Sequence, residues 1–248
     1  MFCKVKIKNN SYNSYYETYN DKNMQPLVIL HGWGVDSSIF NNLINKLNYF
    51  VVVIDFLGFG KSDKVITPLS LEDYVSQVNQ VIKYLNLKNY YILGHSFGGR
   101  VAIKYNYYYD IRALILVDSA GIKHNSFQLK IKIFKYKIKK HIYKFFNKDK
   151  YNKLINESGS SDYKILSGVM KQTMNKVIKV DLKKYCHSPT KTLILWGIND
   201  TETKINDAYT FYNIFKNARL IQFYHSSHFP FLTEEKKFIR VVNEVLDD

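Results

Sequence analysis

Ser96 lies in the sequence context that most clearly indicates chemistry. It is the centre of Gly94-His-Ser-Phe-Gly98, a G-x-S-x-G pattern that follows the apolar run 90–93. A helical pattern over 97–107 begins at once. A tight turn between a strand and a helix lifts a serine hydroxyl clear of a sheet and places it at a helix N-terminus, which favours developing negative charge. The pattern predicts that Ser96 is a nucleophile.

A nucleophilic serine needs a base to take its proton. His228 is the predicted base, because it follows the strand-like run 220–224 and precedes the helical pattern 235–246. A loop in that position can bring a histidine over the serine. His225 lies three residues closer to the strand and is the alternative.

The base in turn needs a carboxylate that orients its ring and stabilises the imidazolium. Asp200 is the predicted acid, since it follows the strand-like run 192–196 in the turn Gly197-Ile-Asn-Asp200. Asp118 ends the strand-like run 111–117 and is the alternative. Asp200 is favoured because the chain order Ser, Asp, His, with the acid after the penultimate strand, is the commoner layout.

Acyl transfer also needs N–H donors for the oxyanion. The run 27–30 ends in His31-Gly-Trp-Gly34, whose glycines let backbone N–H groups turn inward. The predicted oxyanion hole consists of the backbone N–H groups of Trp33 and Phe97. The predicted substrate-binding residues are His31, Gly32 and His95. No metal or organic cofactor is implied.

Strand-like and helix-like segments alternate along most of the chain, which predicts an α/β fold with a mostly parallel central sheet and helices on both faces. The predicted strands are 2–8, 15–19, 27–30, 49–54, 90–93, 111–117, 192–196 and 220–224. The predicted helices are 38–47, 71–85, 97–107, 204–215 and 235–246. Catalytic groups of such sheets lie at the carboxyl ends of the strands.

The alternation stops between 121 and 187, where the pattern is helical. We expect residues 1–120 and 188–248 to form the core and 121–187 to form an inserted helical cap or lid. Residues 122–150 hold ten lysines and one acidic residue. Two interpretations stay open: a lid helix with a solvated basic back, or a docking surface for an acidic partner such as an acyl-carrier protein or an anionic membrane.

The net charge of +15 suggests nucleic-acid binding, but no supporting motif accompanies it. Many Lys, Asn, Ile and Tyr residues are those that A+T-rich codons favour, so we expect no nucleic-acid partner. The chain has no apolar run long enough to span a bilayer and no signal-peptide core, which favours the cytoplasm. Cys3 and Cys186 have no metal or redox spacing.

These patterns together resemble the α/β-hydrolase superfamily over nearly the whole chain. Further similar stretches are Asp55-Phe-Leu-Gly-Phe-Gly-Lys-Ser62 and His228-Phe-Pro-Phe-Leu-Thr-Glu234. One departure is Ser227, where the family often has glycine before its histidine. The most similar subgroup is the small lidded carboxylesterases and carbon–carbon bond hydrolases, and His31-Gly-Trp-Gly34 is also similar to methyl esterases that act on carrier-bound acyl chains.

The resemblance implies a carboxylesterase-type serine hydrolase that cleaves a small-molecule ester or thioester through an acyl-enzyme on Ser96. Related dehalogenases and epoxide hydrolases use aspartate at the position of Ser96, which argues against both. Two alternatives stay open: a carbon–carbon bond hydrolase with the same triad, and a ligand-binding receptor on the same fold with little turnover.

Overall fold

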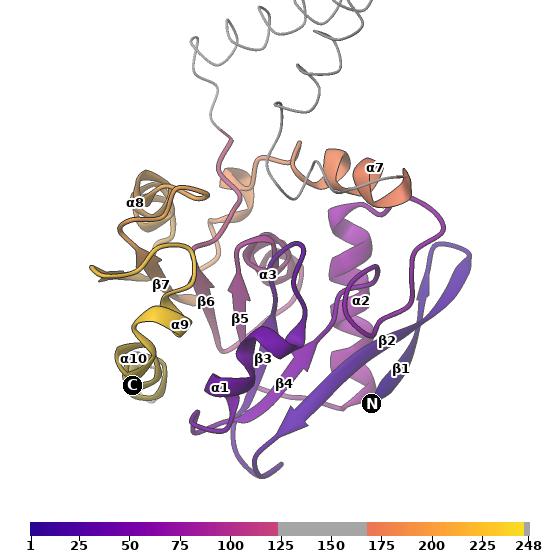
Figure 1. Ribbon diagram of the computed structural model, residues 1–248, viewed down its shortest axis with the longest axis horizontal. Helices are drawn as coiled ribbons and strands as arrows, with labels where there is room; N and C mark the ends of the chain where they lie inside the picture. The colour runs from indigo at the N-terminus through magenta and orange to yellow at the C-terminus, as the bar shows by residue number, and fades with distance from the viewer. Residues whose placement is uncertain (124–167, 246–248) are drawn as a thin grey trace, which may run out of the picture.

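The computed structural model describes residues 1–123 and 168–245, and the strands of these ranges form one sheet (Figure 1). The strands are β1 (Phe2–Ile7), β2 (Asn10–Tyr19), β3 (Pro26–Leu30), β4 (Phe50–Ile54), β5 (Tyr91–His95), β6 (Ala113–Val117), β7 (Lys191–Gly197) and β8 (Ala218–Phe223). Their order is β1-β2-β4-β3-β5-β6-β7-β8. Pairing is antiparallel from β1 through β2 to β4 and parallel in every other pair. The predicted mostly parallel sheet is confirmed.

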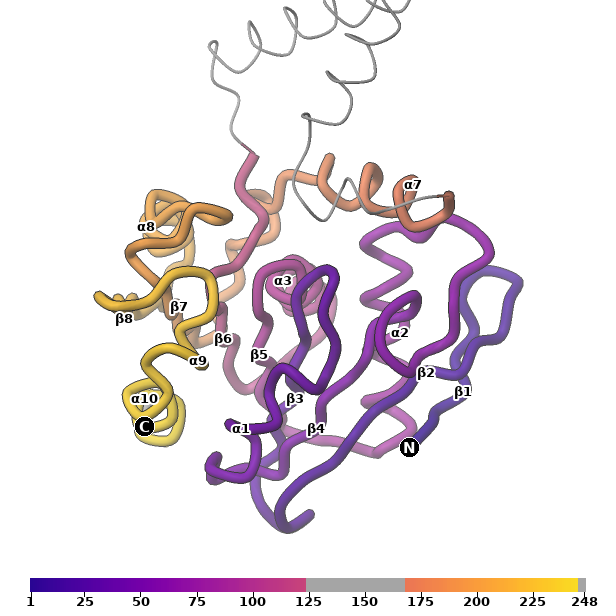
Figure 2. The backbone as a smooth tube through the Cα atoms, in the orientation of Figure 1, coloured from indigo at the N-terminus to yellow at the C-terminus, as the bar shows by residue number. Residues whose placement is uncertain are grey.

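Helices cover both faces of this sheet. The helical segments are η1 (Ser37–Phe40), α1 (Asn41–Ile44), α2 (Leu71–Tyr84), α3 (Phe97–Tyr108), α7 (Gly168–Val177), η2 (Lys183–Tyr185), α8 (Ile205–Ile214), α9 (Pro230–Thr233) and α10 (Glu235–Val245). Side chains of α2, α3 and α8 enter one buried cluster, and those of α1, α9 and α10 enter the other. Figure 2 shows the β1–β2 hairpin and the N-terminus at one side of the sheet and α10 with the C-terminal end at the other.

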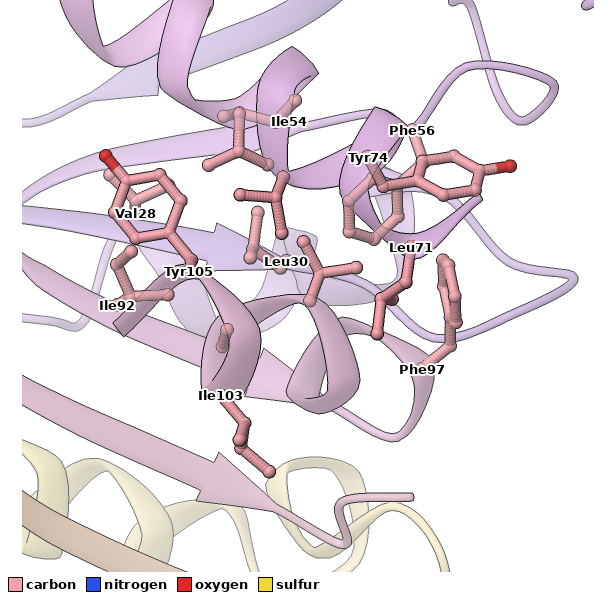
Figure 3. Close-up of a cluster of buried hydrophobic side chains, with 14 of the residues drawn as sticks. Val28, Leu30, Ile54, Phe56, Leu71, Tyr74, Ile92, Phe97, Ile103 and Tyr105 are labelled. Atoms are coloured by element: carbon pink, nitrogen blue, oxygen red, sulfur yellow. The ribbon is translucent and has the colours of Figure 1, made fainter. Parts of the chain in front are cut away.

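Alternation along the strands builds the two cores. Val28 and Leu30 of β3 enter the cluster beneath α2 and α3, whereas the alternate residues Leu27 and Ile29 enter the opposite cluster. Successive side chains of a strand point to opposite faces, so a strand that is apolar throughout needs a cover on both sides. Figure 3 shows the first cluster, where Phe97 of α3 packs near Phe56 and Tyr74.

Apart from shifts of one or two residues at element ends, the structure differs from the predicted elements mainly in three places. The expected helix 38–47 is a short 3₁₀ turn followed by the four-residue α1, and Asp36 Oδ1 caps the turn by accepting the Ser38 N–H at 3.0 Å. β2 begins at Asn10, earlier than expected, because residues 10–15 pair with β1 in an antiparallel hairpin. The short α9 has too few residues to give a periodic signal.

The predicted insertion 121–187 falls mostly outside the described residues, and so does its basic stretch beyond Lys123. The lid and the domain boundaries therefore stay predictions. Its described end is helical at α7, and the buried Arg100 of α3 donates from Nη1 to the carbonyls of Val177 and Val180 at 3.1 and 2.9 Å. Leu69 N–H donates to Thr173 Oγ1 at 3.0 Å. These bonds fasten α7 to the core.

Within the two described ranges, no helix combines the length and apolar character needed to cross a membrane.

Candidate active site

Ser96 forms the turn between β5 and α3, and its backbone is left-handed, with φ +52° and ψ −111°. Such a conformation is strained for a residue with a Cβ atom and persists where the surroundings hold it in place. Here the Ser96 N–H donates to the Val117 carbonyl at 3.0 Å, and the Ser96 carbonyl accepts the Gly99 and Ala120 N–H groups, each at 3.1 Å. The main chain around the predicted nucleophile is therefore fixed by hydrogen bonds.

The glycines around Ser96 are required by close backbone contact. A Cβ atom on Gly98 would lie 2.1 Å from the carbonyl oxygen of Leu30, and one on Gly94 would lie 2.5 Å from the carbonyl oxygen of Gly98. Neither approach is sterically possible without moving backbone. This packing explains why a small residue stands two positions either side of the serine.

His228 and Asp200 are in direct contact. His228 Nδ1 donates to Asp200 Oδ2 at 2.7 Å. The Asp200 side chain is fully buried, whereas 14% of the His228 side chain is exposed. A carboxylate bound to Nδ1 directs the basic Nε2 lone pair of a neutral imidazole away from it, which is the arrangement a general base needs.

Hydrogen bonds keep the Asp200 carboxyl group ionised. Its Oδ1 accepts the Glu202 and Thr203 N–H groups at 2.7 and 3.1 Å, and its Oδ2 also accepts the Thr203 hydroxyl at 2.6 Å. Burial alone raises the pKa of Asp200, but the hydrogen bonds from His228 and Thr203 outweigh it and hold that pKa below its ordinary value. Asp200 is thus a preorganised anion beneath His228.

The loop of His228 packs directly on the loop of Asp200. Asn199 N–H donates to the Ser226 carbonyl at 3.1 Å, and a Cβ atom on Gly197 would lie 2.0 Å from the carbonyl oxygen of Ser227. Glu234 closes the same loop, because its Oε2 accepts the His225 N–H and the Ser226 hydroxyl at 2.9 and 2.8 Å.

These contacts place the alternative base apart from the acid. His225 is exposed, and it donates its backbone N–H to Glu234. The structure therefore brings His228, and not His225, onto Asp200.

The predicted oxyanion hole lies against Ser96. A Cβ atom on Gly32 would be 3.4 Å from the Cβ of Ser96, and the rings of Trp33 and Phe97 meet edge to face with centroids 5.1 Å apart. Phe97 is the first residue of α3, so its N–H has no acceptor within the helix. The two turns that carry the predicted donors thus meet at the nucleophile.

His31 and His95, predicted to bind substrate, are both buried and hold backbone in place. His31 Nδ1 donates to the Gly32 carbonyl at 2.7 Å and its Nε2 accepts the Phe56 N–H at 2.9 Å. His95 Nε2 donates to the His228 carbonyl at 2.8 Å. Burial, and then the neighbouring His228, lower the pKa of His95 to about 3, so its ring is neutral. Contact of these two rings with substrate stays a prediction, because their buried nitrogens face the protein.

Asp118, the alternative acid, lies next to Asp200 instead of replacing it. Asp118 Oδ1 accepts the Gly197 N–H at 2.9 Å. One carboxyl oxygen of Asp118, one of Asp200 and a ring nitrogen of His228 lie within 4.8 Å of one another. These atoms are of the kind that bind metals, but His228 Nδ1 and Asp200 Oδ2 already share a hydrogen bond. We therefore interpret the cluster as acid–base machinery.

Sequence reasoning missed two residues of this site, Thr203 and Glu234. Thr203 follows Asp200 by three residues, and an aspartate that accepts the N–H groups two and three positions later is a familiar local turn. That signal was available in Asp200-Thr-Glu-Thr203. Glu234 had no comparable signal, since its partners are eight and nine residues earlier.

Comparisons with known proteins agree with this architecture. A family model described as alpha/beta hydrolase fold matches residues 25–153. Lipase 3 of Moraxella sp. (strain TA144) is 25% identical over an alignment of 242 positions that covers 86% of this chain and 74% of that lipase. An esterase from Exiguobacterium antarcticum superimposes with a TM-score of 0.75 at 23% identity over 100% of both chains. A meta-cleavage product hydrolase from Pseudomonas fluorescens gives a TM-score of 0.73 at 17% identity over 99% of this chain and 97% of its own.

Some curated relatives are matched over only a small part of their length. An uncharacterized protein of Mycobacterium tuberculosis is 32% identical over an alignment of 100 positions that covers 39% of this chain and 29% of that protein. The solved structures share the fold at low identity. The family model matches more than half of the 248 residues, so this chain belongs to the alpha/beta hydrolase fold family.

Proposed function

We propose that this protein is a serine hydrolase that cleaves a carboxylic ester or thioester through an acyl-enzyme on Ser96. The observation that carries the proposal is the 2.7 Å hydrogen bond between His228 Nδ1 and Asp200 Oδ2. The His228 loop is also bonded to the residue before Ser96, because His95 Nε2 donates to the His228 carbonyl. A base oriented by a buried carboxylate, next to a serine in a strained turn, supports nucleophilic acyl transfer.

The reaction runs in two steps. Ser96 Oγ attacks the substrate carbonyl while His228 takes the hydroxyl proton, and Asp200 stabilises the imidazolium that forms. The N–H groups of Trp33 and Phe97 hold the oxyanion, and each such donor is worth about 10²- to 10³-fold in kcat. His228 then protonates the leaving alcohol or thiol. Water activated by the same histidine hydrolyses the acyl-enzyme.

The similarity to Lipase 3 of Moraxella and to the Exiguobacterium esterase supports an ester substrate, although both similarities are distant. The acyl chain and the leaving group depend on residues over the site. The segment expected there is 121–187, and its residues 124–167 lie outside the described residues.

A fluorophosphonate probe followed by mass spectrometry tests the proposal. We expect covalent labelling of Ser96 in the folded wild-type protein, no labelling in Ser96→Ala, and turnover of short p-nitrophenyl esters by wild type alone. A folded protein that leaves the probe unreacted would overturn the proposal. Hydrolysis of a ring-fission dienol in preference to every ester would replace it with the carbon–carbon bond hydrolase alternative.

A further inference from the structure

Asp118 is held against the Asp200 loop by hydrogen bonds from both its backbone and its side chain. It follows β6, it is fully buried, and its backbone is left-handed with φ +42°. Its N–H donates to the Leu195 carbonyl at 3.0 Å, and its carbonyl accepts the Thr203 hydroxyl at 3.0 Å. With the Gly197 N–H on its Oδ1, three hydrogen bonds join Asp118 to the segment 195–203 that carries Asp200.

The second carboxyl oxygen of Asp118 is in an unusual position. Asp118 Oδ2 is buried and has no N–H or O–H donor within the described parts of the chain. The charged side chain that acts on the Asp118 carboxyl group is that of Asp200, and one carboxyl oxygen of each lies within 4.8 Å of the other. The Asp200 oxygens already accept four hydrogen bonds, from Glu202, His228 and Thr203. A buried polar atom without a partner is costly, so an oxygen with an acceptor as its neighbour has to become a donor itself.

Two buried carboxyl groups this close cannot both be ionised, because each negative charge opposes the other. The hydrogen bonds decide which keeps the proton. Asp200 accepts four and is stabilised as the anion, whereas Asp118 accepts one, from Gly197. Burial, followed by the charge of Asp200, raises the pKa of Asp118 to about 9. The proton therefore stays on Asp118 at neutral pH.

We propose that Asp118 and Asp200 form a carboxylic acid–carboxylate pair that shares one proton, with Asp118 Oδ2 as the donor that positions Asp200 beneath His228. The inference rests on the proposed function, since it assigns a positioning residue to the same triad. In this arrangement the pair carries one negative charge, on Asp200. If the Asp200 side chain is neutralised, the carboxyl group of Asp118 can carry that charge, since it also lies within 4.8 Å of His228.

Among the described residues, the titratable groups near Asp118 follow or end three strands. Asp200 follows β7 and His228 follows β8, both within 4.8 Å of Asp118 through their nearest ligand atoms. His95 ends β5, where it pairs with Val117 in the sheet, and its ring is neutral. Only the pair itself is expected to change charge near pH 9, when Asp118 loses its proton and the two carboxylates repel.

The first test reads the proton directly and needs no turnover. Infrared difference spectra of the full chain in a Ser96→Ala background should show a protonated-carboxyl band at pH 7 that disappears above about pH 10 and is absent in Asp118→Asn. Asp55→Asn is the matched control, because Asp55 is a buried strand-end carboxyl whose two oxygens both accept backbone N–H groups, and it should keep the band. Absence of the band in the parent protein would overturn the shared proton.

Asp118→Asn is the suitable variant because Asn adopts left-handed backbone readily and can accept from Gly197 while donating to Asp200. With p-nitrophenyl acetate, we expect wild type to show a change in kcat near pH 9, where Asp118 loses its proton. Asp118→Asn should lower kcat modestly, leave KM unchanged and lack this change near pH 9. We expect the single variant Asp200→Asn to keep at least about tenfold more activity than the double variant Asp118→Asn/Asp200→Asn. The reason is that Asp118 ionises once residue 200 is neutral.

Equal activities of Asp200→Asn and the double variant, or a pH step that survives in Asp118→Asn, would overturn the positioning role. Failure of the proposed function has a different signature. In that case wild type itself neither reacts with the fluorophosphonate probe nor turns over the ester, while the infrared band still reports on the pair.

Discussion

His95 Nε2 donates to the backbone carbonyl of His228 at 2.8 Å, and their rings lie 4.8 Å apart, centroid to centroid. Because a carbonyl oxygen only accepts, the His95 proton is on Nε2. His95, which precedes the predicted nucleophile, is thus hydrogen-bonded to the backbone of His228, the predicted base. The low pKa of His95, about 3, keeps its ring uncharged beside His228, the residue that gains a proton in the proposed reaction.

Loss of the His95 donor should therefore reduce turnover more than binding. We expect His95→Phe, which keeps a ring but removes the donor to the part-buried His228 carbonyl, to lower kcat about tenfold or more with little change in KM, and to cost about 1–3 kcal/mol of stability. His95→Gln carries an N–H donor of similar reach and should recover much of kcat. Steady-state kinetics and thermal unfolding check both. A fully active His95→Phe would show that the hydrogen bond from His95 does not position His228.

The two histidines of the loop 225–228 should differ sharply when removed. His228→Ala deletes the group bonded to Asp200 and should lower kcat by about 10⁴-fold or more. His225→Ala keeps the backbone N–H that donates to Glu234 and should stay within about threefold of wild type, since ordinary surface substitutions have small effects. The rate of fluorophosphonate labelling measures both without knowledge of the natural substrate. The reverse order would exchange the two assignments.

The elbow glycine Gly98 should tolerate no side chain. Gly98→Ala places a methyl group 2.1 Å from the Leu30 carbonyl oxygen, so we expect a loss of about 3 kcal/mol or more, or failure to fold. Gly168→Ala is the matched control, because Gly168 has φ +56° and no atom of the described residues lies within 4 Å of the added carbon. Its cost should be about 1 kcal/mol, from the left-handed backbone alone. Chemical denaturation compares the two, and equal costs would argue against the close backbone contact.

The raised pKa of Asp118 predicts an unusual pH dependence of stability. Its folded pKa of about 9 exceeds the ordinary value, so between about pH 4 and pH 9 the folded state binds this proton and the unfolded state does not. Stability is then greatest below pH 4 as far as this group is concerned, and falls by at most roughly 1.4 kcal/mol per pH unit as pH rises towards 9.

Asp118→Asn should remove that dependence. We expect the free energy of unfolding of the variant, relative to wild type, to increase from pH 5 to pH 9 and to level off above it. Urea titrations at several pH values give this difference. A flat difference across the range would show that Asp118 is ionised in the folded protein.

Local sequence predicted much of the fold and the elbow, for a physical reason. A strand buried on both faces must be apolar throughout, as β3 and β4 are, and these runs can be recognised without knowledge of their neighbours. The G-x-S-x-G turn is similarly local, because the clashes that require Gly94 arise within the turn itself. Where the signal was weak, as in the four-residue α1 and α9, the boundaries differed or the element was missed.

The partners of Ser96 were a different matter. By sequence, His225 and His228 follow the same strand, and Asp118 and Asp200 end neighbouring strands, so position alone ranked each pair without deciding it. Contacts between loops decide it: the Gly197 turn packs on the Ser227 carbonyl and brings His228 onto Asp200. The protonation of Asp118 likewise depends on burial and on the charge of Asp200, 82 positions away in sequence number. Such effects belong to the tertiary structure, because burial and the approach of two charges exist only once the chain has folded.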